Sequence, residues 1–314
     1  MEEKMKRPIV YAVVVTYYPQ ADTFLPLMNE LVQQTDMVII VDNTDASDDR
    51  FFEVLYKKNS YIEHINIIRL GKNFGIAAAL NVGIEAAKIA GCTHVLLSDQ
   101  DSLPDSKMVF NLLRAELEVS KTGVKVGAVG PTYTDLHTKI TYPFQAQLPR
   151  HFFYGHQAPT PANPHVEALT LITSGTLIPI EVFQDVSLMR EDFFIDQVDI
   201  EWCHRARSRG YHLFGTGYAT MYQRMGESHL RVWYLRWRNE SAYSPLRIYY
   251  RLRNYVALCR LEYIDWRWKL RSSWYSAGIV YTHVFFGANR LEALKMVLKG
   301  VWHGLCQKMG QYEG

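Results

Sequence analysis

The chain has 314 residues, of which 48% are hydrophobic, so it is long enough for one large domain or for a catalytic domain with an appendage. Its net charge is only +2, and its four cysteines are scattered without a Cys-x-x-Cys pair, which argues against a zinc site or a disulfide framework. The first apolar run, 9–15, is too short for a signal peptide, so we expect a cytoplasmic location.

The charge is distributed unevenly along the chain. Residues 231–314 contain 14 Lys and Arg against 5 Asp and Glu, a net charge of +9, so the preceding 230 residues carry −7. Six of the seven tryptophans also lie after residue 230. We therefore predict an acidic catalytic domain at 1–230 and a basic, aromatic helical extension at 231–314.

Short apolar runs alternate with amphipathic stretches in the first half of the chain. The runs predict strands at 9–16, 37–42, 65–70, 94–98 and 126–130, and the stretches predict helices at 23–34, 48–57, 76–90 and 106–120. Strands that alternate with helices indicate βαβ units, so we expect an α/β fold with a mostly parallel sheet and flanking helices.

The second half is less regular. A loop that contains proline and aromatic residues runs from 132 to 164 and is followed by a predicted strand at 169–178. A helix is predicted from about Asp199 to Gly210, and the tail from about 232 is predicted to be helical. Residues 272–289 lack Asp, Glu, Lys and Arg, but polar side chains dilute them. We expect this segment to lie against a membrane or pack on the catalytic domain rather than span a bilayer.

Asp99 and Asp101 are the sharpest chemical signal in the sequence. They stand one residue apart directly after an apolar strand, at the edge of the sheet where α/β proteins bind ligands. Two carboxylates in this position can hold Mg²⁺ or Mn²⁺ against the oxygens of a diphosphate. The alternative is a solvated turn in which one of the two caps the following helix.

Other polar residues follow strands without deciding a function. Asp42 ends the second strand, where it can contact a nucleotide base or cap a turn, and the spacing alone favours the turn. The segment 71–75 contains two glycines but matches neither the dinucleotide fingerprint nor the P-loop. Asp196 and Asp199 can act as helix caps, or one of them can serve as a general base.

The order and spacing of several motifs resemble the inverting family 2 glycosyltransferases with the GT-A fold, and within them the bacterial rhamnosyltransferases. The resemblance extends from about residue 9 to 228. The motifs that carry it are Val13–Tyr17, Val41–Asn43, Asn73–Gly75, Ser98–Asp101, Thr173–Thr176 and the acidic helix Asp199-x-Glu201-Trp202-Cys203-x-Arg205. A further segment, Arg251–Asn254, also resembles this subgroup, either as a phosphate contact or as a basic helix face.

This resemblance implies a site. Asp199 would be the catalytic base, and Asp99 and Asp101 would hold Mg²⁺ or Mn²⁺. The residues implied on the donor side are Thr16, Tyr17, Asp42, Asn73, Gly75, Asp99, Gln100 and Asp101. The residues implied on the acceptor side are Ser174, Gly175, Glu201, Trp202 and Arg205. The donor half would cover about 1–130 and the acceptor half about 131–230.

The implied reaction transfers L-rhamnose from dTDP-L-rhamnose to a lipid-linked glycan acceptor, with inversion, in bacterial O-antigen or capsule biosynthesis. The basic extension would then contact the cytoplasmic face of the inner membrane, and no nucleic acid partner is expected. Two departures from the family pattern concern the site. Val198 replaces a common Glu before the base, and Gln223 stands where many relatives have a metal-proximal His, with His229 as a possible substitute.

Alternatives from other classes remain at this stage. The donor can be a UDP- or GDP-hexose, because a fold does not fix a substrate. A second hypothesis is a non-catalytic relative that only binds nucleotide sugar or acts as a scaffold. Gln223 favours this hypothesis, and the presence of Asp99, Asp101 and Asp199 opposes it. A nucleotidyltransferase would carry a Gly-rich basic loop after the first strand, where this chain has Thr16–Pro19.

Overall fold

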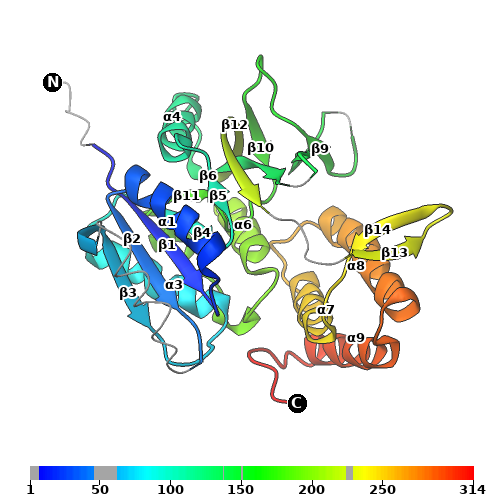
Figure 1. Ribbon diagram of the computed structural model, residues 1–314. Helices are drawn as coiled ribbons and strands as arrows, with labels where there is room; N and C mark the ends of the chain where they lie inside the picture. The colour runs from blue at the N-terminus through cyan, green and yellow to red at the C-terminus, as the bar shows by residue number, and fades with distance from the viewer. Residues whose placement is uncertain (1–6, 46–61, 137, 150, 224–228) are drawn as a thin grey trace.

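The computed structural model describes residues 7–45, 62–136, 138–149, 151–223 and 229–314, and Figure 1 shows how its parts are arranged. An α/β body, blue to green, carries a sheet that has ten strands in the described part of the chain. Three helices of the C-terminal extension, yellow-orange to red, lie beside this body. The helix predicted at 48–57 lies outside the described residues.

The first half of the body alternates strands and helices as predicted. The strands are β1 (Val10–Thr16), β2 (Met37–Asp42), β3 (Ile65–Arg69), β4 (His94–Asp99) and β6 (Val126–Asp135), and the helices are α1 (Ala21–Gln34), α3 (Ile76–Ile89) and α4 (Met108–Ser120). Strands β4, β1, β2 and β3 pair in parallel in that order. The prediction of an α/β fold with a largely parallel sheet and flanking helices is confirmed.

The parallel strands end level with one another. Thr16 of β1 is paired with Asp42 of β2, and Val15 is paired with Asp99 of β4. Strands β1, β2 and β4 are almost entirely buried, which matches their apolar sequences, because helices cover both faces of a parallel sheet. The polar residues that follow these strands therefore gather along one edge.

The second half of the body is mixed. Its remaining strands are β5 (Leu103–Pro104), β7 (Thr141–Tyr142), β8 (Phe144–Ala146), β9 (Gly155–Gln157), β10 (His165–Ala168), β11 (Thr176–Pro179) and β12 (His212–Gln223), and its helices are α5 (Val182–Val186) and α6 (Val198–Ser208). Short 3₁₀ helices occur at η1 (Ile62–His64) and η2 (Glu191–Phe193). The sheet order is β10-β12-β6-β11-β4-β1-β2-β3.

The single strand predicted at 169–178 is wrong. The chain forms β10 and β11 instead, and the bend between them ends at Gly175, whose φ of +79° suits glycine. The Gly175 amide donates a hydrogen bond to the carbonyl of Leu97, and β11 then pairs antiparallel with both β4 and β6. A turn inside an apolar run cannot be seen from hydrophobicity alone.

The extension begins with a hairpin rather than with the predicted helix. Strands β13 (His229–Trp233) and β14 (Trp237–Ser241) pair antiparallel, and Leu235 in the turn has a φ of +61°. Three helices follow, namely α7 (Pro245–Cys259), α8 (Trp266–Phe286) and α9 (Arg290–Leu305). None of the helices in the described part of the chain is long and apolar enough to cross a membrane.

The extension packs tightly within itself and against the body. Gly300 and Gly304 of α9 let this helix approach α7 closely, because a Cβ at either position would lie 2.7 Å from the α7 backbone. Leu258, Ile264 and Trp268 belong to the same buried cluster as the sheet. The core is thus shared between the two parts of the chain, and the division at residue 230 remains a prediction from charge.

Candidate active site

A pocket of about 420 Å³ lies at the carboxyl ends of β1 and β4 and faces the N-terminus of α6. Its lining includes side chains from the body and one from the extension. The polar residues in it are Tyr17, Asn43, Asn73, Asp99, Gln100, Asp101, Thr173, Asp196, Gln197, Asp199 and Arg247. The structure therefore brings Asp99, Asp101 and Asp199 together, although 97 residues lie between Asp101 and Asp199 in sequence.

Asp99 sits at the end of β4 on a network of buried hydroxyls. Its amide donates to the Oγ of Ser174, which in turn donates to the Oγ of Ser102 at 2.7 Å. Burial raises the pKa of Asp99 to about 7, and the negative charges of Asp101 and Asp199 act in the same direction. This pocket concentrates negative charge that a cation would relieve.

Asp199 lies in the first turn of α6, after a loop with an unusual backbone. Phe194, Asp196 and Gln197 have φ values of +63°, +63° and +67°, in the left-handed region that costs energy for residues other than glycine. The Asp199 carboxylate accepts a hydrogen bond from the amide of Ile200 at 2.8 Å. Burial nevertheless raises the pKa of Asp199 to about 6, and the charge of Asp196 contributes.

Helix α7 of the extension holds this loop in place. Asn254, which is fully buried, donates from Nδ2 to the carbonyls of Phe193, Ile195 and Asp196 at 2.8–2.9 Å. Arg253, also fully buried, donates to the carbonyl of Phe193 at 2.9 Å and to that of Gly310. These bonds satisfy carbonyls that the irregular backbone would otherwise leave without partners.

Arg247, one helical turn before Tyr250 on the same helix, reaches the pocket itself. Its guanidinium lies 3.3 Å from the carboxylate of Asp196, and its side chain is 52% exposed. Its positive charge lowers the pKa of Asp99, against the larger effect of burial. No other Lys or Arg lines the pocket within the described residues.

The turn before α3 forms another wall of the pocket. Asn73 accepts from Asn43 at 3.1 Å and from the amide of Gly75 at 2.9 Å. Gly75 has a φ of +87°, and a Cβ there would lie 2.6 Å from the carbonyl oxygen of Phe194. The glycine is thus required for the close approach of the loop that leads to Asp199.

Four expected donor residues lie at the ends of β1, β2 and β4. Tyr17 and Gln100 form a reciprocal pair in which the Tyr17 amide donates at 2.7 Å and Gln100 donates back at 3.1 Å. Thr16 is fully buried and donates to the carboxylate of Asp42, which also accepts from Thr44 at 2.7 Å. Asp42 and Thr16 do not line the pocket, so their donor role remains a prediction.

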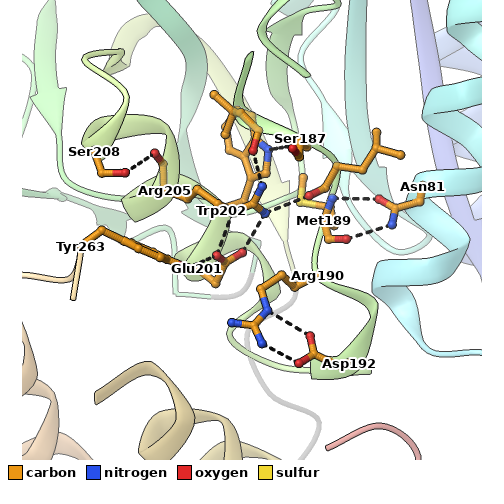
Figure 2. A network of polar contacts seen from close by, with 12 residues as sticks. Asn81, Ser187, Met189, Arg190, Asp192, Glu201, Trp202, Arg205, Ser208 and Tyr263 are labelled. Atoms are coloured by element: carbon orange, nitrogen blue, oxygen red, sulfur yellow. Dashed lines mark hydrogen bonds and ion pairs between the residues drawn. The ribbon is translucent and has the colours of Figure 1, made fainter. Parts of the chain in front are cut away.

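None of the five residues expected on the acceptor side lines this pocket. Ser174 is fully buried under Asp99, and Gly175 forms the turn before β11. Glu201 is fully buried and pairs with Arg205 at 2.9 Å, as Figure 2 shows. Trp202 donates from Nε1 to the carbonyl of Ser187 at 3.1 Å. Trp202 and Arg205 thus connect α6 to the loop that precedes it.

Arg205 forms further hydrogen bonds between α6 and the preceding loop. It donates to the carbonyl of Leu188 at 2.8 Å and to that of Val186, while Tyr263 of the extension donates to the carboxylate of Glu201. The sequence pair Glu201–Arg205 is thus an i,i+4 ion pair that is buried rather than exposed.

The carboxylates in this pocket are suitable ligands for a hard divalent cation. Carboxylate oxygens of Asp99 and Asp101 are its preferred ligands, and the raised pKa of Asp99 marks charge that lacks full compensation. Within the described residues no three His, Cys, Asp or Glu side chains form a complete ligand set. Mg²⁺ at phosphates is typically bound by one or two protein carboxylates, and oxygens of the substrate and of water fill its remaining coordination positions.

Gln223 lies next to the turn that carries Asp99 and Asp101. Its Nε2 donates to the Oγ of Ser102 at 2.8 Å, directly after Asp101. It therefore supports the backbone turn that carries the two aspartates. Arg224–Gly226 and the side chain of His229 lie outside the described residues.

Sequence reasoning missed Asn43, Gln197 and Arg247 among the lining residues. Asn43 had a signal, since it directly follows the Asp that ends β2. Gln197 and Arg247 had none, because a loop and a distant helix enter the pocket only through packing of the extension on the body.

The chain is similar in sequence to known proteins. Residues 12–167 match the family described as Glycosyl transferase family 2. A dTDP-rhamnosyl transferase, RfbF of Shigella flexneri, is 28% identical over 298 residues, which cover 94% of this chain and 95% of that protein.

Solved structures share the fold at low sequence identity. A crystal structure of GalNAc-T7 with UDP, GalNAc and Mn²⁺ superposes with a TM-score of 0.60 at 12% identity, over 96% of this chain. This chain spans 56% of that longer protein. A crystal structure of S. aureus TarS in complex with UDP-GlcNAc has a TM-score of 0.54 at 15% identity, over 95% of this chain and 80% of that one.

Proposed function

The chain belongs to glycosyltransferase family 2, and we propose that it transfers L-rhamnose from dTDP-L-rhamnose to a hydroxyl of a lipid-linked glycan. The donor assignment is supported by the similarity to RfbF over nearly the whole of both chains. The observation that carries the reaction type is the convergence of Asp99, Asp101 and Asp199 on one pocket.

Asp199 is the proposed general base. Its pKa of about 6 leaves it ionised at neutral pH, yet closer to the operating pH than an ordinary aspartate, which favours proton transfer. It would accept the proton of the acceptor hydroxyl as the oxygen attacks the anomeric carbon and the bond to the diphosphate breaks. One displacement inverts the anomeric centre, so the chain needs no covalent nucleophile.

The opposite wall of the pocket is the proposed site of the leaving group. Asp99 and Asp101 would hold Mg²⁺ or Mn²⁺, whose charge offsets the negative charge that develops on the diphosphate. Arg247 adds a cationic side chain to the same pocket. Asn73 and the Tyr17–Gln100 pair line it on the side of the parallel strands, where the nucleotide would lie.

The extension is the proposed contact with the cytoplasmic face of the inner membrane. One face of α9 packs on α7, and its opposite face presents apolar side chains that are 40–85% exposed. They recur at helical spacing: Leu291, Leu294, Leu298, Trp302 and Leu305. An exposed stripe of Leu and Trp on a helix that also carries lysines is typical of helices that lie in a lipid interface.

The reaction is tested by incubating the purified full chain with dTDP-, UDP- and GDP-sugars and Mg²⁺ or Mn²⁺. Released nucleoside diphosphate would be measured. We expect release from dTDP-rhamnose above that from the other donors, and loss of release on chelation of the cation. Release from a UDP- or GDP-sugar without release from dTDP-rhamnose would contradict the donor assignment.

Membrane contact is tested separately by flotation with vesicles that contain anionic lipid. Replacing Leu298 and Trp302 by Ser should move the protein off the vesicles, because both side chains are more than 60% exposed and contribute little to the fold. Replacing the exposed Phe110 of α4 by Ser is the matched control in the body. Equal flotation of all three proteins would contradict the proposal.

A further inference from the structure

A second pocket, of about 460 Å³, adjoins the first and lies between the body and helices α7 and α8. Gln197, two residues before Asp199, lines both pockets. The second pocket is walled by β6–β8 on one side and by Trp268, Arg271 and Tyr275 of α8 on the other. A molecule in it would therefore lie next to the proposed base, on the side away from β1 and β2.

Two buried polar atoms on this pocket lack partners. Within the described residues, three buried side-chain nitrogen or oxygen atoms have no hydrogen-bond partner, and the Oε1 of Gln197 and the Nε of Arg251 are two of them. Both residues line the second pocket. Because an unsatisfied buried polar group is costly, such a pair in one pocket indicates a ligand that offers both a donor and an acceptor.

The charge of this pocket is opposite to that of the first. Arg251 and Arg271 line it, and no Asp or Glu does within the described residues. Arg251 lies over the rings of Tyr243 and Tyr275, at 4.8 and 5.7 Å from their centroids, so its guanidinium is held in place. Arg271 donates to the carbonyl of Tyr154 and lies beside His156.

His156 lines the same pocket beside Arg271. Burial lowers its pKa, and the neighbouring Arg271 lowers it in the same direction. The remaining lining is largely apolar and aromatic, with the rings of Tyr133, Phe144 and Trp268. Aromatic faces with a few fixed polar groups are typical of small-molecule sites, and sugars present both apolar ring faces and hydroxyls.

We propose that this pocket is the acceptor site and that it takes a sugar bearing an anionic group, either a phosphate or a carboxylate, held by Arg251 and Arg271. Gln197 accepts a hydrogen bond from a hydroxyl of that sugar and orients it toward Asp199. This inference rests on the proposed function, because it requires that Asp199 acts on an acceptor hydroxyl. The small volume of the pocket places the anion on, or next to, the acceptor sugar itself.

The proposal is tested by calorimetric binding to the full chain saturated with dTDP and Mg²⁺. The probes are glucose, galactose and N-acetylglucosamine, each as a neutral methyl glycoside and as a 1-phosphate, together with methyl glucuronide. We expect at least one anionic sugar to bind about 10-fold more tightly than its neutral counterpart, since hydrogen bonds to charged groups are the strong ones. A preferred 1-phosphate indicates a phosphate-linked acceptor, and a preferred glucuronide indicates an acidic sugar.

Variants decide whether the pocket is responsible. Arg251→Gln and Arg271→Gln should each abolish the preference, Arg251→Lys should retain part of it, and Arg290→Gln, on the exposed start of α9, should leave it unchanged. The inference is overturned if no anionic sugar is preferred, or if the preference persists in both Gln variants. Thermal unfolding identifies a variant that has lost its fold, in which case the other arginine carries the test.

A failure of this inference can be distinguished from a failure of the proposed function. Hydrolysis of dTDP-rhamnose without acceptor requires only the first pocket. If hydrolysis occurs and the anion preference is absent, the inference alone fails. If the preference is present and dTDP-rhamnose is not cleaved, the donor assignment alone fails.

Discussion

The body and the C-terminal extension contribute opposite chemistry to one site. The body supplies carboxylates at strand ends and at the start of α6, namely Asp99, Asp101 and Asp199. The extension supplies arginines, with Arg247 on the first pocket and Arg251 and Arg271 on the second. The extension is therefore part of the site, since it lines both pockets and holds the loop before Asp199.

The two regions also differ in how their structure arises. Parallel strands bring their carboxyl ends to one edge by the geometry of the sheet, so the positions of Asp42 and Asp99 follow from local sequence. The arginines of the extension reach the site only because α7 and α8 pack on the body through side chains such as Leu258 and Trp268.

The largest effect is expected in the body, from Asp199→Asn. Asparagine keeps the size and the hydrogen bond to the Ile200 amide but cannot accept a proton, so transfer should fall by about 10²–10⁴-fold. Binding of dTDP, measured by calorimetry, should be unchanged. Near-normal transfer would move the base to another residue.

The pH dependence of transfer by the native protein is a second test of Asp199 as the base. Since the pKa of Asp199 is raised to about 6, the carboxylate is protonated below that pH and cannot act as a base. At saturating Mg²⁺, which would keep Asp99 ionised, the transfer rate at low acceptor concentration should therefore fall about tenfold per pH unit below 6 and be level above it. A rate that is constant down to pH 4.5 would contradict the assignment.

The next largest effect tests the extension, through Asn254→Ala. Removing this side chain deprives the carbonyls of Ile195 and Asp196 of a buried donor, whereas the carbonyl of Phe193 keeps its bond from Arg253. The free energy of unfolding should fall by about 4 kcal/mol. Transfer by the folded fraction should fall as well, because the loop before Asp199 loses its support.

Asn81→Ala is the matched control in the body. Asn81 is also buried and forms two hydrogen bonds of 2.9 Å with the backbone of Met189, as Figure 2 shows. Its loss should destabilise the fold by a similar amount, with a smaller effect on the transfer rate per folded molecule. Equal rates for both variants would show that support of the residues directly before Asp199 has no separate effect on transfer.

A third prediction concerns the interface between body and extension. His204 of α6 is buried against Trp268 of α8, and burial lowers its pKa to about 4. Between pH 6.5 and 4 the unfolded chain binds the proton that folded His204 does not, so stability is lost as the pH falls. The loss should reach about 3 kcal/mol at pH 4. His204→Phe should remove this part of the pH dependence in urea unfolding, and an unchanged profile would exclude His204 as its source.

The smallest expected effect is that of Arg247→Gln. The KM for the nucleotide sugar should rise about 10-fold, because the pocket loses its cationic side chain, and the increase should shrink at high salt. Arg290→Gln, which removes an exposed charge from α9, is the control. A KM that does not change would show that the extension contributes no charge to donor binding.

The amino-acid sequence alone predicts the alternating strands and helices, the ends of β1, β2 and β4, and the acidic pair Asp99 and Asp101 beside an apolar strand. These features are local, because the side-chain pattern of a strand and the residues that follow it depend on neighbours in sequence. The same locality explains the errors. The turn at Gly175 and the hairpin β13–β14 depend on partners that hydrophobicity does not reveal.

Only the tertiary structure decided which distant residues share a pocket. Glu201 and Arg205 are expected on the acceptor side, yet they form an ion pair that lines neither pocket. Arg247 and Gln197 carry no local signal. The physical reason is that the packing of α7 and α8 on the body is set by the fit of many side chains over long separations. No short motif encodes that fit.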